Sequence, residues 1–598
     1  MRWATLAIRP AGGDEEATEV GKSESRRRIP VPGPVLQGLL AFLIYLGVFI
    51  WAFGQAVIQH LNVPVVGQNY VDPNFYIWAW RWWPYAVTHW TNPLYSYQIM
   101  APQGVNLAWA TTSPSAALFM WPVTAAWGSI VSFNVTLLLA PPASAWAAFV
   151  ATRRLTGKFW AALPAGVIYG FNVYTLDHEI SGQPNLTVNL LLPLMVYLAV
   201  AWWQDSLGRI GYVIWMMIAF ALEFYTFLEA FAQLSLLMAV GFLIGFAVAG
   251  REYWRKVARL AVLTTIAYVG GLVLAGPYLR YALANYPTTL VRGEDHFSMD
   301  LSGLILPRVD RVWGPSWLHG AAGHDIAANS YLGLPLMIIL IWLAIVSWSN
   351  RLVRLLVIIF VVIIALAAGP NLIVGGSHLF ALPWGGLWTL PFFRSAEPVR
   401  LILFGYLVFS IILALWLARV TKTWLSRAVK WGLAALGLAV IFADLPTFAS
   451  VVVPPAPHYQ PAIKDLPQQN ELPSFFSQGL YKDYISPGET VAILSHRGNA
   501  GMMFQAATDF YFRLPGGFIN ASLSRPDALP VPIASMSHIT KIRVAQFEAY
   551  VHHDNIGAIV VEHAWSEDWM YVWREIGIKG VNVGGVTIYQ LNNVRENG

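Results

Sequence analysis

The sequence predicts a polytopic α-helical membrane protein of about eleven spans with a small α/β domain at its C-terminal end. Three observations carry this prediction. Of the 598 residues, 57% are hydrophobic and only 12% are charged, whereas a soluble protein has about 25% charged residues. The mean hydropathy is +0.53, and apolar runs of about 17 to 25 residues, long enough to cross a bilayer, recur along the chain. After about Pro454, short strand and helix patterns replace these runs.

The composition also excludes several classes of function. The chain contains no cysteine, which excludes disulfides, thiolate metal sites and thiol nucleophiles. It has 37 basic and 32 acidic residues, but in a membrane protein these charges first report topology, and they are no sign of nucleic-acid binding. The sequence lacks a Walker-type phosphate loop, a GxSxG elbow and an HExxH motif. These absences disfavour an ATP-driven pump, an α/β-hydrolase and a zincin.

The N-terminal tail, 1–34, contains the basic cluster Arg26, Arg27 and Arg28 shortly before the first apolar run. This cluster predicts that the tail lies in the cytoplasm. The first span, about 35–58, is then an uncleaved signal anchor that runs outward. The first outer loop, 59–131, follows it. Its stretch 68–104 holds Trp78, Trp80, Trp82, Trp83 and Trp90. Because tryptophan concentrates where a membrane meets water, we expect this stretch to lie on the membrane surface with most of its aromatic side chains as interfacial anchors.

The apolar segment 113–128 decides the topology of everything after it. It is short and interrupted by Pro122, so we interpret it as a juxtamembrane helix. The remaining spans are expected near 132–152, 159–176, 184–203, 211–228, 229–249, 257–280, 330–348, 353–369, 398–418 and 430–448. This arrangement places every short basic loop in the cytoplasm, as the positive-inside rule requires. A full span at 113–128 would place those loops outside.

The outer face is then formed by the loop 59–131, the hairpin 177–185, the loops 282–328 and 370–397, and the tail 451–598. Residues 453–461 are rich in proline and act as a linker. The tail shows strand patterns at 491–495, 556–562 and 584–591, and helix patterns at 538–553 and from Ser566. This alternation predicts a small extracytoplasmic α/β domain over 451–598.

Asp72 is the first candidate site residue. It precedes Pro73, which predicts that a helix begins there. A carboxylate just beyond a first span, on the outer surface, suits a general base or a ligand for a hard divalent cation. The alternative is that it merely caps the helix.

The hairpin 177–185 concentrates Asp177, His178, Glu179 and Gln183. These side chains could complete a metal site with Asp72, or His178 could bind a phosphate. The alternative is a solvated turn, because short loops are polar by default.

Three further groups of charges are candidates. Glu223 and Glu229 lie in or beside apolar sequence, where an ionised carboxylate usually faces a cavity or a partner. Arg394 and Arg400 lie at the outer mouth of a span, where the positive-inside rule does not explain basic residues. Pairing with Glu397 or with a lipid phosphate would explain them. Arg308 and Arg311, in the loop 282–328, could also contact a phosphate, although mixed charge in a long loop is mostly solvation.

Several motifs together resemble the GT-C superfamily of membrane glycosyltransferases. They are the signal-anchor span, an outward loop with an acid near its start, a second span ending in RRLTGK, and the segment GFNVYTLDHEISGQPNLTVNLLLPL. Within that superfamily the sequence is most similar to the bacterial YfhO-like branch. In the hairpin motif of that branch, Gln183 stands where a histidine is expected. RSAEPVR corresponds to the arginine-containing motif of that branch at the outer mouth of a span. The resemblance covers roughly residues 35–450.

The resemblance implies an inverting glycosyltransferase that takes sugar from a polyprenyl-phosphate donor at the outer face of the cytoplasmic membrane. Asp72 would be the catalytic carboxylate, and Asp177 or Glu179 would help it hold a divalent cation such as Mg or Mn. Arg394 and Arg400 would stabilise the departing phosphate. The acceptor would be a glycan or envelope polymer, Trp78 and Trp82 could stack on sugar rings, and no nucleotide is needed. The alternatives are a transporter or flippase of lipid-linked saccharide, and a non-catalytic cell-envelope protein.

Overall fold

The computed structural model describes most of the transmembrane domain and part of the C-terminal domain. The described residues are 33–64, 71–284, 298–306, 330–382, 384–387, 390, 393, 396–421, 423–444, 471–495, 499–517, 549–562, 573–574 and 577–591. The N-terminal tail, most of the loop 282–328, Arg394, the linker 453–461 and the helix predicted from Ser566 lie outside them. So does most of the helix predicted at 538–553.

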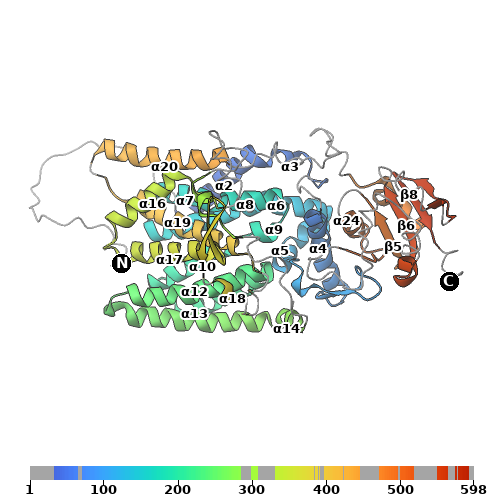
Figure 1. Ribbon diagram of the computed structural model, residues 1–598, viewed down its shortest axis with the longest axis horizontal. Helices are drawn as coiled ribbons and strands as arrows, with labels where there is room; N and C mark the ends of the chain where they lie inside the picture. The colour runs from blue at the N-terminus through green and yellow to red at the C-terminus, as the bar shows by residue number, and fades with distance from the viewer. Residues whose placement is uncertain are drawn as a thin grey trace, which may run out of the picture.

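The first two-thirds of the chain form a bundle of apolar helices (Figure 1). In the described part of the chain, seven segments are long and apolar enough to cross a membrane, as expected of a multi-pass membrane protein. They are Pro34–Gly54 (α2 and η1), Trp121–Thr156 (α6), Pro184–Trp203 (α9, Pro184–Thr187, and α10, Leu191–Trp203), Arg209–Thr226 (α11), Leu228–Val248 (α12), Arg251–Leu274 (η3 and α13) and Pro398–Ala418 (η6, Pro398–Leu401, and α19, Ile402–Ala418).

The predicted count of eleven spans is therefore not confirmed. The other four predicted spans are helices too: α7 (Phe159–Gly170), α16 (Leu334–Val346), α17 (Arg351–Ala367) and α20 (Trp424–Asp444), but they are not among the seven. At a rise of about 1.5 Å per residue, α7 and α16 are about 18 to 20 Å long, shorter than the bilayer core of about 30 Å. The chain turns at Gly170, where a span was expected to run on to 176.

The burial of the helices separates the centre of the bundle from its outer surface. The segment Pro398–Ala418 is 94% buried within the protein, whereas α12 is only 17% buried. Large apolar side chains stay exposed on the outer helices, for example Leu43 on α2, Leu243 on α12 and Ile345 on α16. A contiguous apolar surface of this kind fits lipid and not water. We conclude that α19 is the central helix and that α2, α12 and α16 face the membrane.

The segment 113–128 is not a full span. It forms α5 (Pro114–Phe119) and the beginning of α6. At Gly128 the backbone has φ 85° and ψ 168°, which is not helical, so α6 consists of two helices joined at a kink. Glycine tolerates this positive φ because it has no Cβ. The second of the two helices contains the predicted span 132–152, in agreement with the sequence.

The tryptophan-rich stretch is a helix, as expected, but its aromatic side chains do not lie on the membrane surface. Helix α4 (Val71–Thr88) buries Trp78 and Trp80 completely and leaves Trp82 and Trp83 at most 4% exposed. Only Trp90, after the helix, is exposed. Stacked and edge-to-face contacts join these rings to one another and to Phe510 of the tail. The interfacial-anchor prediction was wrong for the four tryptophans of α4 because their rings are buried against other protein side chains.

The described part of the tail contains a four-stranded sheet in the order β5-β6-β8-β7. Its strands are Thr490–Leu494 (β5), Ile556–Glu562 (β6), Val581–Val583 (β7) and Val586–Gln590 (β8). β5 and β6 are parallel, and the other two pairs are antiparallel. Short helices α23 (Ser474–Ser477) and α24 (Ala500–Ala507) accompany the sheet. Three of these strands coincide with the segments predicted at 491–495, 556–562 and 584–591.

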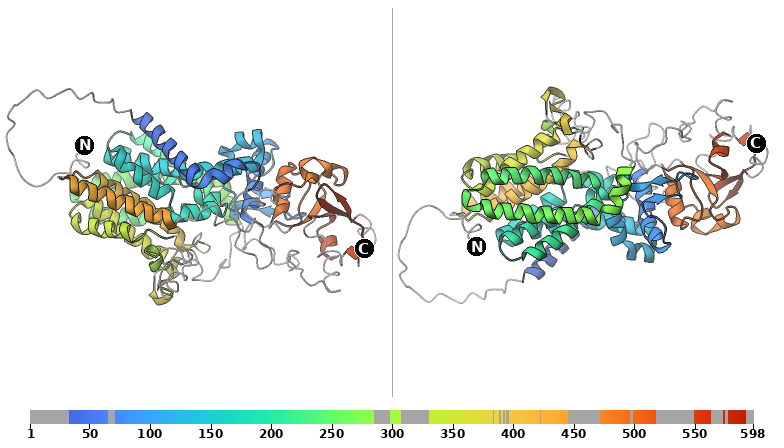
Figure 2. Two further views of the ribbon diagram at one scale, coloured as in Figure 1. Left: turned by 90° about the horizontal axis from the view of Figure 1, so that it is seen from above. Right: turned by 90° about the horizontal axis from the view of Figure 1, so that it is seen from below.

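The tail packs against the first outer loop through α24 and α4, which lie side by side in Figure 1. The indole nitrogen of Trp78 donates to Gln505 Oε1 over 2.7 Å, and Arg81 pairs with Asp509 at 2.7 Å. The backbone of Met100 and Ala101 donates to Gly516 and Leu514 of the tail. Both views in Figure 2 place the C-terminal sheet beyond α4, at one end of the bundle.

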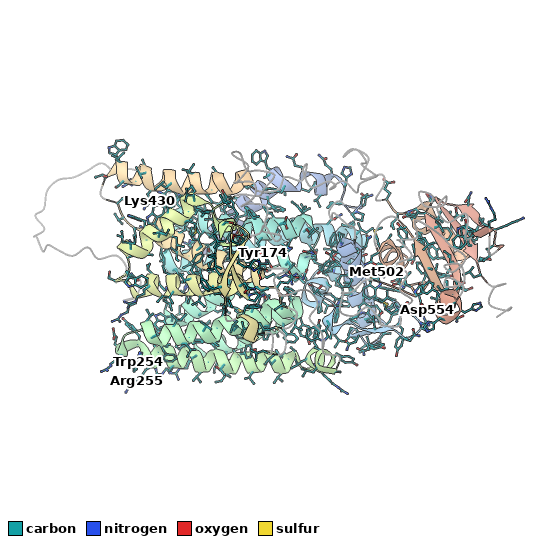
Figure 3. All side chains as sticks on the ribbon, viewed as in Figure 1. Tyr174, Trp254, Arg255, Lys430, Met502 and Asp554 are labelled. Carbon is teal, nitrogen blue, oxygen red and sulfur yellow. The ribbon has the colours of Figure 1, made fainter. Side chains whose placement is uncertain are left out.

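Basic residues gather at the opposite end. Figure 3 shows Lys430 and Arg255 at the end of the bundle far from Met502 and Asp554 of the tail. Lys158 Nζ donates to Ala418 O at 2.6 Å, and Lys430 Nζ donates to Leu417 O and Arg419 O. These lysines satisfy the free carbonyl groups at the C-terminal end of α19 and complement its dipole. These basic residues and the tail therefore lie at opposite ends of the bundle.

Smaller elements complete the described fold. They are α3 (Gln55–Gln59), β1 (Tyr95–Ser96) paired with β2 (Val105–Asn106), η2 (Leu107–Trp109), α8 (Val173–Ile180), α14 (Gly276–Ala284), η4 (Leu301–Leu304), β3 (Asn371–Val374) paired with β4 (Ser377–Ala381), α18 (Trp384–Leu387) and η8 (Leu480–Asp483).

Candidate functional site

Asp72 and the segment 177–185 meet in the structure. Asp72 lies in the first turn of α4. The predicted hairpin is not an extended turn, because Asp177, His178 and Glu179 occupy the end of α8 and Gln183 precedes α9. Gln183 Nε2 donates to Asp72 Oδ2 over 2.7 Å, and Gln183 Oε1 lies 2.7 Å from His178 Nδ1. The three side chains form one hydrogen-bonded chain between two distant parts of the sequence.

The hydrogen-bonding capacities of these groups fix the direction of the chain. An ionised carboxylate only accepts hydrogen bonds, so the Gln183 amide must point its NH₂ at Asp72 and its oxygen at His178. The oxygen also only accepts, and therefore Nδ1 of His178 carries the proton. Nε2 is left as an acceptor. It is buried and has no hydrogen-bond partner among the described residues. His178 thus presents an unused acceptor atom inside the site.

The environment of His178 keeps it neutral. Burial, with a smaller contribution from the positive charge of Arg400, lowers the pKa of His178 to about 4, against the opposing influence of Asp177 and the hydrogen bond to Gln183. The ring of Tyr174 packs edge-on against the imidazole at 4.5 Å. At neutral pH a neutral imidazole can accept a hydrogen bond but adds no positive charge. A phosphate would therefore gain no ion pair from His178.

Tyr76 lies one turn after Asp72 on α4. Its hydroxyl donates to Asn185 Oδ1 in a short hydrogen bond and lies 3.0 Å from Thr111 Oγ1. Burial and the nearby charge of Asp72 raise the pKa of Tyr76, while Arg400 on the other side lowers it. The hydroxyl therefore lies within the electrostatic reach of both charges. It tethers the start of α4 to α9 and so supports the contact between Asp72 and Gln183.

Arg400 is surrounded by carboxylates. It forms ion pairs with Glu229 of α12 and, at 3.0 Å, with Glu397, and its guanidinium lies 5.4 Å from the ring centre of Phe227. The Glu397 backbone N–H also donates to Glu229 Oε1 over 2.7 Å. These contacts confirm the expected pairing of Arg400 with Glu397 and give Glu229 its partner. Since two carboxylates face one guanidinium, the group has no net positive charge to offer a phosphate when all three are ionised.

The electrostatic influence of Arg400 connects the two halves of the site. It lowers the pKa of Tyr76, of Tyr174 and of His178, each of which burial otherwise dominates. Arg400 begins the central span, and Tyr76 and His178 belong to the layer outside it. Figure 3 labels Tyr174 well inside the molecule, between the ends marked by Lys430 and by Met502. Arg400 is thus close enough to Tyr76, Tyr174 and His178 to influence the pKa of each.

The expected metal ligands do not form a cluster. In the described part of the chain no group of three or more His, Asp or Glu side chains could hold a metal ion. Glu179 is 1% exposed, and its burial raises its pKa well above the usual value, against a lowering contact with Thr187. Asp72 Oδ2 is engaged by Gln183. These residues do not fit a three-ligand metal site, so the metal role of Asp72, Asp177 and Glu179 stays a prediction without support from this geometry.

The remaining candidates lie apart from the Asp72 chain or outside the described residues. Glu223 is 1% exposed in α11, and its Oε2 has no hydrogen-bond partner among the described residues. Arg394, Arg308 and Arg311 fall outside the described ranges. The phosphate role of Arg394 and Arg400 therefore stays a prediction.

Sequence reasoning missed the residues that support the site. Tyr76, Thr111 and Asn185 are uncharged and were not singled out. The spacing of Asp72 and Tyr76, four residues apart in an expected helix, places them on one face and was the available signal. No pattern in the sequence could have paired Thr111 or Asn185 with Tyr76, because those contacts join segments 35 and 109 residues apart.

Comparison with solved structures gives similarities of low sequence identity. The archaeal oligosaccharyltransferase AglB from Archaeoglobus fulgidus, solved with an inhibitory peptide and a dolichol-phosphate, is 12% identical, with a TM-score of 0.49, over 90% of this chain and 70% of that one. ArnT from Cupriavidus metallidurans, solved with undecaprenyl phosphate, is 10% identical, with a TM-score of 0.46, over 93% and 97%. Similarities at these TM-scores leave the function to be argued from the residues of the site.

No curated protein matches the chain. One family model does, that of a domain of unknown function, DUF6311, and it matches residues 42–446. The match begins in the first span, includes Asp72, the 177–185 segment and Arg400, and ends two residues beyond α20. It covers more than half of the 598 residues. The chain belongs to the DUF6311 family.

Proposed function

We propose that this protein is a membrane glycosyltransferase that transfers sugar from a polyprenyl-phosphate donor to an acceptor at the outer face of the cytoplasmic membrane. One observation carries the proposal. A carboxylate, Asp72, is oriented by Gln183, which also bonds His178, and the charge of Arg400 reaches His178. General base catalysis requires a positioned carboxylate within reach of a bound hydroxyl. The site meets a helix bundle through which a lipid-linked donor could approach.

In the proposed reaction, the acceptor hydroxyl oxygen attacks the anomeric carbon of the donor sugar on the face opposite the phosphate. A new carbon–oxygen bond forms as the bond from the anomeric carbon to the phosphate oxygen breaks. The electron pair leaves with the polyprenyl phosphate, and the acceptor proton passes to the Asp72 carboxylate. The configuration at the anomeric carbon is inverted. No nucleotide is needed in these steps, and a divalent cation held by Asp72 with Asp177 or Glu179 stays a prediction.

The neighbours of Asp72 have positioning roles in this proposal. Gln183 fixes the orientation of the carboxylate through Oδ2. His178, neutral at physiological pH because of its lowered pKa, fixes the orientation of the Gln183 amide through Nδ1. The Arg400 group sits at the start of the central span, where the donor phosphate would arrive. We expect Arg400 to bind that phosphate only if one of its two carboxylate partners, Glu229 or Glu397, is protonated or displaced.

The test is sugar transfer by the purified protein in lipid nanodiscs. The donor is a polyprenyl-phosphate hexose, and release of polyprenyl phosphate is measured for the wild type, for Asp72→Asn and for Asp205→Asn. Asp205 is a matched control, because it is an exposed aspartate that pairs with Lys256 at 3.2 Å, far along the chain from the site. We expect at least about a hundredfold loss for Asp72→Asn, within the range for removal of a general base, and no loss for Asp205→Asn.

Two results would contradict the proposal. The first is undiminished release of carrier by Asp72→Asn, which would remove the base from the mechanism. The second is movement of the lipid-linked sugar across the bilayer without carrier release in the wild type. That result would identify the protein as a transporter or flippase of lipid-linked saccharide.

A further inference from the structure

The first outer loop contains a cavity that the proposed reaction does not use. It has a volume of about 560 Å³ and is lined by Trp82, Tyr85, Thr91, Asn92, Tyr95, Tyr97, Gln98 and Tyr281. This volume falls within the range of about 300 to 1,000 Å³ that small-molecule sites occupy. Five of the eight lining residues are aromatic, and none carries a charge at neutral pH. The lining therefore favours an uncharged ligand with flat apolar faces and polar edges.

Hydrogen bonds and ring contacts hold several aromatic side chains of the lining. Trp82 donates its indole N–H to Pro93 O over 2.9 Å and stacks on Tyr85, with ring centres 6.0 Å apart. Tyr95 donates to Gln103 O over 2.9 Å, and its ring centre lies 5.0 Å from that of Tyr97. Tyr97 is 58% exposed. Rings that are fixed before binding lose little conformational entropy when a ligand stacks on them.

The far wall of the cavity is attached to the loop by hydrogen bonds. Tyr281 belongs to α14, and its hydroxyl accepts from Asn92 Nδ2 at 2.7 Å. The Tyr281 carbonyl accepts from Asn106 Nδ2 at 2.9 Å, and the Ala282 carbonyl accepts from Trp109 Nε1 at 2.7 Å. These bonds join segments about 175 residues apart in the chain. The cavity is thus a built feature of the fold and not a gap between two unconnected loops.

One polar atom in the lining lacks a partner. Gln98 Oε1 is buried and accepts no hydrogen bond from any described residue. That oxygen is shielded from solvent, so a ligand hydroxyl could bond it only after a small movement of the Gln98 side chain; such a bond would remove a cost of about 1–3 kcal/mol. Asn92 and Thr91 add further polar groups on the same lining. A ring with apolar C–H faces and hydroxyl edges, which is the chemistry of a saccharide, matches this arrangement of flat aromatic surfaces and amide groups.

We infer that this cavity binds a neutral oligosaccharide and holds the acceptor of the transfer reaction; the acceptor role rests on the proposed function. Trp82 follows Asp72 by ten residues on the same helix, which is about 15 Å along the axis at 1.5 Å per residue. A single sugar could not occupy the cavity and reach Asp72 at once. The acceptor is therefore a chain of several sugar units, with one part in the cavity and its growing end at Asp72.

The test is saturation-transfer NMR on the full chain in lipid nanodiscs. The probes are three neutral tetrasaccharides, maltotetraose, cellotetraose and α-1,6-mannotetraose, together with a ten-residue proline-rich peptide, since aromatic grooves also bind such peptides. The variants are Tyr97→Ala and Gln98→Leu. Trp90→Ala is the matched control, because Trp90 is an aromatic residue of the same loop that is 95% exposed and does not line the cavity. Thermal unfolding checks that each variant folds.

We expect at least one tetrasaccharide to bind the wild type and Trp90→Ala equally. Tyr97→Ala should weaken that binding at least about fivefold, as loss of an aromatic anchor does, and Gln98→Leu should also weaken it. Absence of binding by all three tetrasaccharides would overturn the inference. Binding of the peptide alone would overturn it in favour of a protein partner, and equal binding by Tyr97→Ala would place the saccharide elsewhere.

Failure of this inference can be distinguished from failure of the proposed function. Asp72→Asn does not alter the cavity and should bind the tetrasaccharides like the wild type. Saccharide binding without carrier release would retain the binding site and contradict the transfer function. Carrier release without tetrasaccharide binding would retain the transfer function and contradict the cavity as the acceptor site.

Discussion

The amide of Gln183 lies between a carboxylate and an imidazole that do not contact each other directly. It donates to Asp72 and accepts from His178, and a glutamine is suited to this because it carries one donor group and one acceptor group. A histidine at the same position would have offered one donor and one acceptor as well, in a more rigid ring. Gln183 therefore supplies the same pattern of one donor and one acceptor that a neutral histidine would supply.

Replacement of Gln183 by leucine tests this positioning role. Gln183→Leu leaves Asp72 Oδ2 and His178 Nδ1 without their shared partner, at a cost of about 1–3 kcal/mol for each buried group. If half of that cost falls on the transition state, sugar transfer slows by about fivefold or more. The measurement is carrier release, with the KM for the donor determined separately from kcat, and we expect the loss in kcat. Gln204→Leu, a similar change at the basic end of the bundle, is the control. Equal rates for the two variants would contradict the role.

The neutral state of His178 gives a pH dependence with a definite sign. Its folded-state pKa of about 4 lies below the ordinary value of about 6.5. At pH values between these two pKa values, the unfolded chain therefore carries a proton on His178 that the folded chain does not carry. The stability due to neutral His178 is fully present above pH 6.5 and is lost as the pH falls toward 4.

We expect the wild-type Tm to fall more steeply between pH 6.5 and pH 4.5 than the Tm of His178→Gln, which can keep the hydrogen bond to Gln183 but does not titrate. Thermal unfolding in nanodiscs, followed by near-UV circular dichroism, measures the two slopes. His552→Gln serves as a control for loss of an exposed histidine in the tail. Parallel slopes for wild type and His178→Gln would show that His178 is not held neutral.

At the scale of elements, α4 is the joint between the transmembrane domain and the tail. Its side chains contact α6 and α24, and it carries Asp72 at its beginning and the wall of the aromatic cavity near its end. Trp80 donates to Thr136 of α6 over 3.0 Å, and Trp78 donates to Gln505 of α24 over 2.7 Å. Rotation of α4 would therefore disturb the site, the bundle contact and the tail contact together.

Two substitutions on α4 should weaken its contact with the tail to different extents, because one removes a buried hydrogen bond and the other removes an exposed ion pair. Trp78→Phe removes a buried donor and leaves Gln505 Oε1 without it, which costs about 1–3 kcal/mol. Arg81→Ala removes an ion pair whose partner Asp509 is 54% exposed, and exposed pairs contribute about 0–1 kcal/mol. Limited proteolysis of the tail should accelerate strongly in Trp78→Phe and little in Arg81→Ala. The reverse order would mean that the ion pair, and not the buried indole contact, holds the tail on α4.

A second anchor holds the loop between α17 and α19. Asp300 accepts from the backbone N–H groups of Gly375 and Gly376, at 2.9 and 2.7 Å, and from Ser302. Burial raises the pKa of Asp300, but the hydrogen bonds from Ser302, Gly376 and Gly375 outweigh burial and lower it overall. An acid whose folded pKa is lowered stabilises the fold at neutral pH, and this contribution is lost as the pH falls below its ordinary range.

Asp300→Asn removes one acceptor and should expose the β3–β4 turn. Hydrogen exchange at Gly375 and Gly376 should become faster at pH 7 by about tenfold, equivalent to about 1.4 kcal/mol of local stability. The same exchange in the wild type should accelerate only at acidic pH, when the carboxylate takes up a proton. Unchanged protection in the variant would show that the β3–β4 pairing alone maintains this turn.

At the scale of the whole molecule, the pattern of apolar runs was enough to place the helices, because each span must satisfy its own backbone within the membrane. It was not enough to count spans, since α7 ends at Gly170 and α8 turns outward by Val173. The sequence singled out Asp72, His178 and Arg400 because charged or titratable groups beside spans are unusual. It placed the tryptophans wrongly, because packing of α4 against the tail depends on contacts more than 400 residues apart.

Membrane orientation is the remaining whole-molecule property, and the absence of cysteine makes it directly measurable. The natural chain has no thiol, so a single introduced cysteine can be labelled without background. Arg255→Cys lies at the basic end of the bundle, and Lys482→Cys lies in the tail at the other end; both positions are exposed.

The positive-inside rule predicts that the basic end is cytoplasmic. A membrane-impermeant maleimide should therefore label Lys482→Cys in intact cells and label Arg255→Cys only after the membrane is opened. Trp90→Cys, in the first outer loop, should behave like Lys482→Cys, because α4 and the tail are in contact. Labelling of Arg255→Cys in intact cells would place Asp72 in the cytoplasm, where a donor presented at the outer face could not reach it.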